Sequence, residues 1–280
     1  MSQRASATEL LPTLDLSGPA LRSGFEELVA AAEPGGGMDV YLTALQFKSK
    51  LFGEWFLGKQ SAALDAPRFL GLCTFMPTVR RRVGAWLGSN DFADLHRQLL
   101  LLMQPGTTVQ ERLDAFVAAF PADRTCRWAR DLAAEVLHFC APEETPLMTR
   151  WMWDARSGSG VLREIWFNDD GRELDPRNIS DRLPTFLVLK SELETFLRDN
   201  GTYRDFGLMQ DLLCAHIYSR YINDRGSTYL KGDFAGVEDA MAHTRRLLGL
   251  DCYERDGIRM KVKLPETMSV ALATPLQLDA

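Results

Sequence analysis

Apolar residues recur every three or four positions over most of this chain, which is the spacing of one buried face of an α-helix. The pattern changes to short apolar runs and strict alternation only in the C-terminal half. The helical pattern predicts two helices on either side of Pro77, one beginning near Asn90, and further helices over residues 17–33, 38–57, 108–120, 123–140, 191–200, 206–222 and 233–248.

Several predicted helix ends carry their own signals. Ser17-Gly-Pro19 is typical of a helix start, and Pro34–Gly37 is typical of a stop and a linker. Thr108–Glu111 and Ser191–Glu194 are capping boxes, in which a hydroxyl and a carboxylate satisfy free backbone N–H groups. Pro77 interrupts an apolar run, so we expect one helix to end there and another to begin.

Three segments predict β-strands. Residues 161–167 precede a turn signal at Asp169–Gly171, and residues 185–189 form a second apolar run. After Asp256-Gly257, apolar and basic residues alternate over 258–264, the strongest strand signal of the chain. We therefore predict a mainly α fold, with a multi-helix, bundle-like body and a small antiparallel β-sheet in the C-terminal half (α+β).

The linker and the change of pattern near Trp153 set the predicted domain boundaries. We expect a flexible N-terminal segment with one short helix at 1–37, a helical body at 38–153, an α+β portion packed on it at 154–265, and a tail at 266–280.

Composition narrows the class of protein. The formal net charge of -6 disfavours nucleic acid and anionic membrane as partners. Five scattered cysteines do not form a disulfide framework, which favours a reducing compartment. No window reaches the length of a signal peptide's apolar core or of a membrane span. We expect a cytoplasmic protein.

Two segments resemble known binding motifs but do not match them. Residues 53–61 nearly match a phosphate-binding loop, but Gln60 stands where the magnesium-binding hydroxyl must follow the lysine. His138 and Cys140, like Cys214 and His216, are two positions apart, so they point about 200° apart on a helix. A mixed site with one residue from each helix stays open, but we predict no metal and no cofactor.

His216 is the residue closest to chemistry. It lies on the apolar face of the predicted helix 206–222, and Arg220 follows one turn later. Two polar residues on such a face are either satisfied core residues or a small polar pocket, where His216 is an acid, base or ligand and Arg220 holds an anion. No third member of such a site can be named from the sequence.

Three sets of residues are candidates for binding a partner. Arg80, Arg81 and Arg82 are expected on the exposed side of a helix. Asp131, Glu135 and His138 are expected along the polar edge of helix 123–140, where Glu135 and His138 also match one half of a di-iron motif whose second half is missing. Trp151 and Trp153 are either core wedges or interface residues.

No complete catalytic motif is present, so the favoured hypothesis is a non-catalytic interaction or accessory protein, for example one that assists assembly or regulation of another complex. Its partner is expected to be a protein. The alternative is an enzyme or small-molecule-binding protein with a polar pocket around His216 and Arg220.

Overall fold

The computed structural model describes residues 12, 14, 16–166, 178–227, 239–254, 257–259 and 261–263. Its helices are α1 (Gly18–Ala32), α2 (Met38–Phe52), α3 (Ala66–Cys73), α4 (Pro77–Arg80), α5 (Val83–Leu87), α6 (Phe92–Leu102), α7 (Val109–Ala118), α8 (Trp128–Cys140), α9 (Val161–Glu164), α10 (Leu183–Asp199), α11 (Phe206–Ser227) and α12 (Ala242–Leu248). Shorter helical turns are η1 (Glu33–Gly35), η2 (Gly53–Leu57), η3 (Lys59–Ala63) and η5 (Leu250–Cys252).

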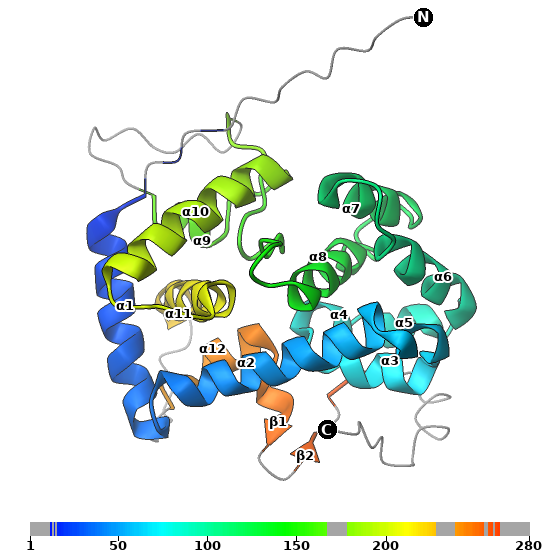
Figure 1. Ribbon diagram of the computed structural model, residues 1–280, viewed down its shortest axis with the longest axis horizontal. Helices are drawn as coiled ribbons and strands as arrows, with labels where there is room; N and C mark the ends of the chain where they lie inside the picture. Colours follow the sequence, from blue (N-terminus) through cyan, green and yellow to red (C-terminus); the bar gives the residue numbers. More distant parts are fainter. Residues whose placement is uncertain are drawn as a thin grey trace, which may run out of the picture.

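Two helices organise the packing (Figure 1). Helix α8 lies in the middle of the molecule and contacts α2, α4, α6 and α7. Helix α11 packs against α1, α9, α10 and α12. Helix α2 contacts both α8 and α11 and so ties the two groups into one body with a contiguous apolar core.

The predicted β-sheet is wrong. Residues 161–164 form α9, and residues 185–189 lie inside α10. The first segment buries Val161, Leu162 and Ile165, and the second buries Thr185, Phe186 and Leu189. Burial at positions i, i+1 and i+4 is a helical pattern and not an alternating one.

Extended pairing among the described residues is limited to two short strands, β1 (Tyr253–Glu254) and β2 (Gly257–Ile258), and two isolated bridges. The two strands form an antiparallel hairpin with Tyr253 opposite Ile258. The strand predicted over 258–264 is therefore confined to its first residue, and positions 260 and 264 lie outside the described residues.

Most predicted helix starts and stops are confirmed. Ser17 caps α1, since its hydroxyl accepts from the N–H of Ala20 at 3.2 Å, and Thr108 and Glu111 form the capping box of α7. The Ser191 box is wrong, because Pro184 in the first turn already starts α10 and Ser191 lies in the helix interior.

The N-terminal helix packs on the body. Phe25 lies edge-on against Phe196, with ring centroids 6.2 Å apart. A Cβ atom added at Gly24 would lie 2.5 Å from Ile217, so glycine allows α1 to approach α11 closely. The flexibility of segment 1–37 stays a prediction, and residues 1–11, 13 and 15 of it lie outside the described residues. In the part of the chain that is described, no helix is long and apolar enough to cross a membrane.

Candidate functional site

The acidic and histidine side chains of α8 are buried, which overturns their predicted place on an exposed edge. Asp131, Glu135 and His138 are 1%, 5% and 1% exposed. Each has a charged or ionisable partner from another segment of the chain: Arg150, Lys48 and Asp211, respectively. The polar stripe of α8 is therefore a row of buried side chains that are ion-paired or hydrogen-bonded, rather than a solvated face.

The Lys48 ammonium that pairs with Glu135 has a hydrogen-bond acceptor for each of its three hydrogens. The ammonium of Lys48 donates to Glu135 Oε2 at 2.7 Å and to the carbonyl oxygens of Phe75 and Leu248 at 2.9 and 3.1 Å, and it lies 3.8 Å from the ring centroid of Phe139. Burial raises the pKa of Glu135, and the charge of Lys48 opposes that rise. With all three ammonium hydrogens used, this pair is structural.

His138 is also enclosed. Its Nδ1 lies 2.7 Å from the carbonyl oxygen of Thr145, and its Nε2 lies 2.6 Å from Asp211 Oδ2. Because a carbonyl can only accept, Nδ1 carries a hydrogen and donates. The cavity beside the pair is about 10 Å³, which is at most the space for one water molecule.

Asp131 connects the interior to a surface cleft. Its carboxylate accepts from Arg150 Nη2 at 2.6 Å and from Nε at 3.1 Å, and it also accepts the Arg150 backbone N–H at 3.2 Å. Burial lowers the pKa of Arg150, but the hydrogen bonds from Arg150 to Asp131 and the negative charge of Asp131 have the larger combined effect. The pKa of Arg150 is therefore raised. Arg150 is therefore a fixed cation at the cleft wall.

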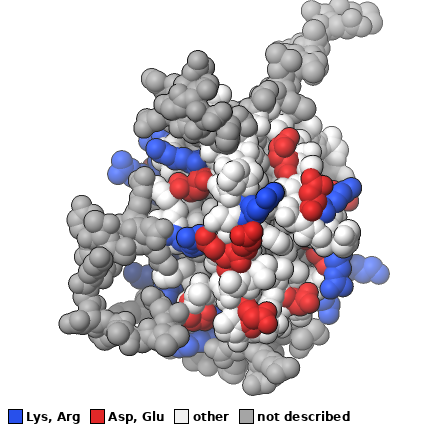
Figure 2. Space-filling model, turned by 90° about the vertical axis from the view of Figure 1, so that its left-hand side faces the viewer, with Lys and Arg blue, Asp and Glu red and all other residues white. Residues whose placement is uncertain are grey.

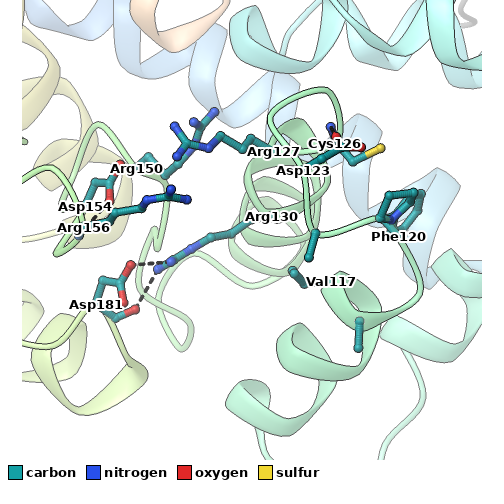
Figure 3. Close-up of a pocket in the computed structure, with 13 residues that line it drawn as sticks. Val117, Phe120, Asp123, Cys126, Arg127, Arg130, Arg150, Asp154, Arg156 and Asp181 are labelled. Carbon is teal, nitrogen blue, oxygen red and sulfur yellow. Dashed lines mark hydrogen bonds and ion pairs between the residues drawn. The ribbon is translucent and has the colours of Figure 1, made fainter.

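Four arginines line this cleft, which we call the arginine cleft: Arg127, Arg130, Arg150 and Arg156. Figure 3 shows their side chains extending into the same space from the start of α8 and from the loop before α9. The cleft has a volume of about 360 Å³. Its other wall is largely apolar and comes from the end of α7 and the following loop: Val117, Ala118, Phe120, Pro121 and Ala122.

The positive charge of the cleft is only partly compensated. Arg130 is paired with the carboxylate of Asp181 and donates to its backbone oxygen at 2.7 Å. The carboxylate of Asp123 accepts three hydrogen bonds from the turn at Thr125 and Cys126, which lower its pKa. Within the described residues, neither Arg127 nor Arg156 has an ion-pair partner.

Local structure holds the loop that carries Arg150 and Arg156. Asp154 and Ser159 form a bridge, and the Asp154 carboxylate accepts the backbone N–H of Arg156 at 3.0 Å. Gly160 has φ 136°, and a Cβ atom there would lie 2.6 Å from the carbonyl oxygen of Met152. Only glycine fits this position, so the loop is fixed against the core.

The structure does not bring His216 and Arg220 together in a pocket. His216 is 3% exposed, its Nδ1 lies 3.2 Å from Thr244 Oγ1, and its Nε2 has no hydrogen-bond partner in the described part of the chain. Burial lowers its pKa. Arg220 points away, is about half exposed and is paired with Glu27 on α1.

The predicted arginine patch is also divided. Arg80 is buried, donates to both carboxylate oxygens of Asp251 at 2.7 and 2.9 Å, and so does not lie on an exposed face as predicted. Lys261 joins the same carboxylate at 3.0 Å. Arg81 and Arg82 are exposed, and their role in partner binding stays a prediction.

Trp151 and Trp153 are 8% and 0% exposed. Trp151 stacks on Tyr218 with centroids 6.3 Å apart, and the Trp153 indole donates to the carbonyl of Ile179 at 3.2 Å. The core interpretation of these residues fits their burial, whereas their predicted role in an interface has no exposed surface to act through.

No group of three His, Cys, Asp or Glu side chains is placed to hold a metal ion within the described ranges. All five cysteines are free. Burial raises the pKa of the Cys140 thiol to about 12 and raises that of Cys214 as well, so neither is poised as a nucleophile.

Sequence reasoning missed the arginine cleft. One signal was available: between Lys59 and Lys190 the chain has no lysine, so arginine supplies every permanent positive charge there. Arginine is the residue suited to two-pronged binding of carboxylates and phosphates. The spacing of Arg127 and Arg130 by one helical turn was a second signal.

The chain matches no protein-family model, no curated protein and no solved structure.

Proposed function

We propose that this chain is a cytosolic, non-catalytic interaction protein that binds an acidic segment of a partner protein in the arginine cleft. Such binding suits an accessory protein that assists assembly or regulation of a complex. The free state of all five cysteines supports a reducing compartment.

The observation that carries the proposal is the position of Arg127 and Arg156. Both line a cleft that already holds Arg130 and Arg150, and neither has an ion-pair partner among the residues described. Arg130 and Arg150 are each paired with an aspartate, and Asp123 and Asp154 also line the cleft, so Arg127 and Arg156 are the guanidinium groups left to bind an added anion. Carboxylates fit the planar fork of arginine through two parallel hydrogen bonds.

The rest of the charged interior supports a binding role over a catalytic one. Lys48, Glu135, His138 and Asp211 have hydrogen-bond partners and lie away from the arginine cleft.

On the face that carries α1, acidic and basic side chains are interspersed with uncharged ones, so no single-sign patch dominates that face (Figure 2).

A second candidate is a binding protein for a small organic anion. The volume of the cleft, about 360 Å³, falls within the range of small-molecule sites. The same four arginines would hold the ligand, so the two candidates differ in the occupant and not in the site.

Affinity capture of the tagged full chain from its native cells, at moderate salt, tests both candidates. The wild type is compared with Arg127→Glu/Arg156→Glu and with Arg124→Glu. Arg124 is exposed in the same turn but does not line the cleft, so it controls for a charge reversal beside the cleft. Mass spectrometry then identifies both co-purifying proteins and bound small molecules.

A stoichiometric protein that is lost with the double variant and kept with the control supports the interaction protein. A small anion with the same dependence supports the second candidate. Partners that are kept by the double variant but lost with Arg81→Ala/Arg82→Ala would overturn the cleft as the binding site.

A further inference from the structure

The arginine cleft adjoins a second cleft on each side. Towards α10 it shares Val117, Ala118, Arg130 and Asp181 with a cleft of about 310 Å³ that reaches Asp114 and Arg182. Towards α6 it shares Phe120, Pro121 and Cys126 with a cleft of about 470 Å³ that reaches Trp86 and Arg97. Shared lining residues place the three clefts side by side around the end of α7.

The charge changes along these clefts. In the cleft towards α10, Arg182 Nη2 lies 3.2 Å from Asp114 Oδ2, and in the cleft towards α6, Arg97 Nη2 lies 2.5 Å from Asp94 Oδ1. The arginines of both flanks thus face carboxylates. Arg127 and Arg156, which have no ion-pair partner in the described part of the chain, lie in the centre.

The flanks offer apolar surface and amide groups. The cleft towards α6 presents Trp86, beside the largely buried Leu95 and Phe120, with Asn90 and Gln98. The cleft towards α10 presents the exposed Val117, beside the buried Leu113, with Gln110. Aromatic and aliphatic walls with a few hydrogen-bonding groups are typical of pockets for apolar side chains of a bound segment.

We propose that the three clefts form one groove that binds an extended peptide segment of the partner, with acidic residues in the centre and uncharged, partly apolar residues on both sides. This inference rests on the proposed function. A uniform polyanion such as a nucleic-acid strand fits less well, because it would bring phosphates against Asp94 and Asp114 at the flanks.

A displayed peptide library tests the inference on the full chain. Each peptide has a central Asp-Glu pair and four randomised positions on each side. We expect selection to enrich large apolar residues on at least one side and to deplete acidic residues on both. The best sequence is then synthesised with a fluorophore, and its affinity is measured by polarisation beside dodeca-glutamate and an oligo-dT strand of twelve nucleotides.

Ala119→Trp tests the flank without touching the core. Ala119 is exposed and lines only the cleft towards α6, so an indole there fills it. Ala115→Trp is the matched control, since Ala115 is exposed on α7, four residues before Ala119, and lines none of the three clefts.

We expect Ala119→Trp to weaken the selected peptide about tenfold, the loss of one buried apolar anchor, and Arg127→Glu/Arg156→Glu to weaken it about a hundredfold or more. Ala115→Trp and Arg124→Glu should each change the affinity by less than about twofold, as expected of surface positions outside the interface.

The outcomes separate the two proposals. Binding of central acidic peptides with no preference at the flanks would overturn the groove and leave the proposed function standing. Tighter binding of dodeca-glutamate or oligo-dT than of the selected peptide would overturn the groove in favour of a polyanion. No binding of any acidic peptide would overturn the acidic-segment function and the groove with it.

Discussion

The ammonium of Lys48 on α2 lies 2.7 Å from the carboxylate of Glu135 on α8, and both side chains are buried. The pair fixes the crossing of the two helices that tie the molecule together. Since the ammonium also donates to two backbone carbonyls, its place is determined by four segments of the chain at once.

The first prediction concerns this pair. Glu135→Gln leaves the buried cation without its counter-charge and should cost about 3–5 kcal/mol in the free energy of unfolding. Lys48→Met should cost less, because the pKa of Glu135 is already raised and the carboxyl can take up a proton. The double variant Lys48→Met/Glu135→Met should be more stable than Glu135→Gln alone.

Urea unfolding followed by circular dichroism measures these differences. Lys50→Met is the control, because Lys50 is exposed two positions along the same helix. Equal losses for Glu135→Gln and Lys50→Met would show that the pair does not hold the crossing.

The second prediction concerns Arg80 and its neighbours. Arg80→Ala removes two hydrogen bonds from the Asp251 carboxylate, which lies on the segment that follows α12. We expect a loss of about 2–4 kcal/mol, since a partly buried carboxylate is left with Lys261 alone. Arg81→Ala and Arg82→Ala should each stay within about 0.5 kcal/mol of the wild type.

Thermal unfolding of the three single variants checks this contrast. A uniform effect of all three substitutions would contradict the division between an internal clamp and an exposed pair.

The third prediction is a pH dependence at His216. Burial lowers its pKa in the folded state, so the unfolded chain binds a proton more readily. The neutral ring therefore favours the fold above the unfolded pKa of about 6.5, and this contribution is lost as the pH falls below that value.

The unfolding free energy of the wild type minus that of His216→Gln isolates this group, because the other titrating groups are common to both proteins. We expect the difference to decrease from pH 7.5 to pH 5. A constant difference would show that folding leaves the pKa of His216 unchanged, and a difference that increases towards acid would show that folding raises it.

Helices were predictable here and strands were not, for a physical reason. Long amphipathic periods and caps such as Thr108 with Glu111 are local, so the sequence alone predicts them. A short segment such as 161–165, with apolar residues at both ends, fits a buried strand or a buried helical turn, and packing decides between them.

The ion pairs could not be predicted because their partners are distant in sequence. Asp131, Glu135 and His138 have the spacing of one helix face, but polarity alone does not tell a solvated face from one whose partners lie elsewhere in the chain. Lys48 comes from α2 and Asp211 from α11, 87 residues before Glu135 and 73 residues after His138. Only the tertiary fold shows that this polar face is internal.

The last prediction is that the cleft arginines lower the stability of the ligand-free protein. Arg127 and Arg156 add two positive charges to a cleft in which Arg130 and Arg150 are already paired with Asp181 and Asp131. Arg127→Ala/Arg156→Ala removes that repulsion and should raise the unfolding free energy by a few tenths to about 1 kcal/mol at low salt. Arg124→Ala, on the same turn but outside the cleft, should leave it within about 0.5 kcal/mol.

In the presence of a binding anion, the wild type should become more stable than the double variant Arg127→Ala/Arg156→Ala. Inorganic phosphate or citrate binds the folded wild type and raises its melting temperature in proportion to the logarithm of concentration, whereas the double variant lacks the site. Differential scanning fluorimetry at low ionic strength, with sodium chloride matched for ionic strength as the control, measures both effects. If phosphate and citrate stabilise the double variant as much as the wild type, the anions act on the general surface, and Arg127 and Arg156 do not form a binding site.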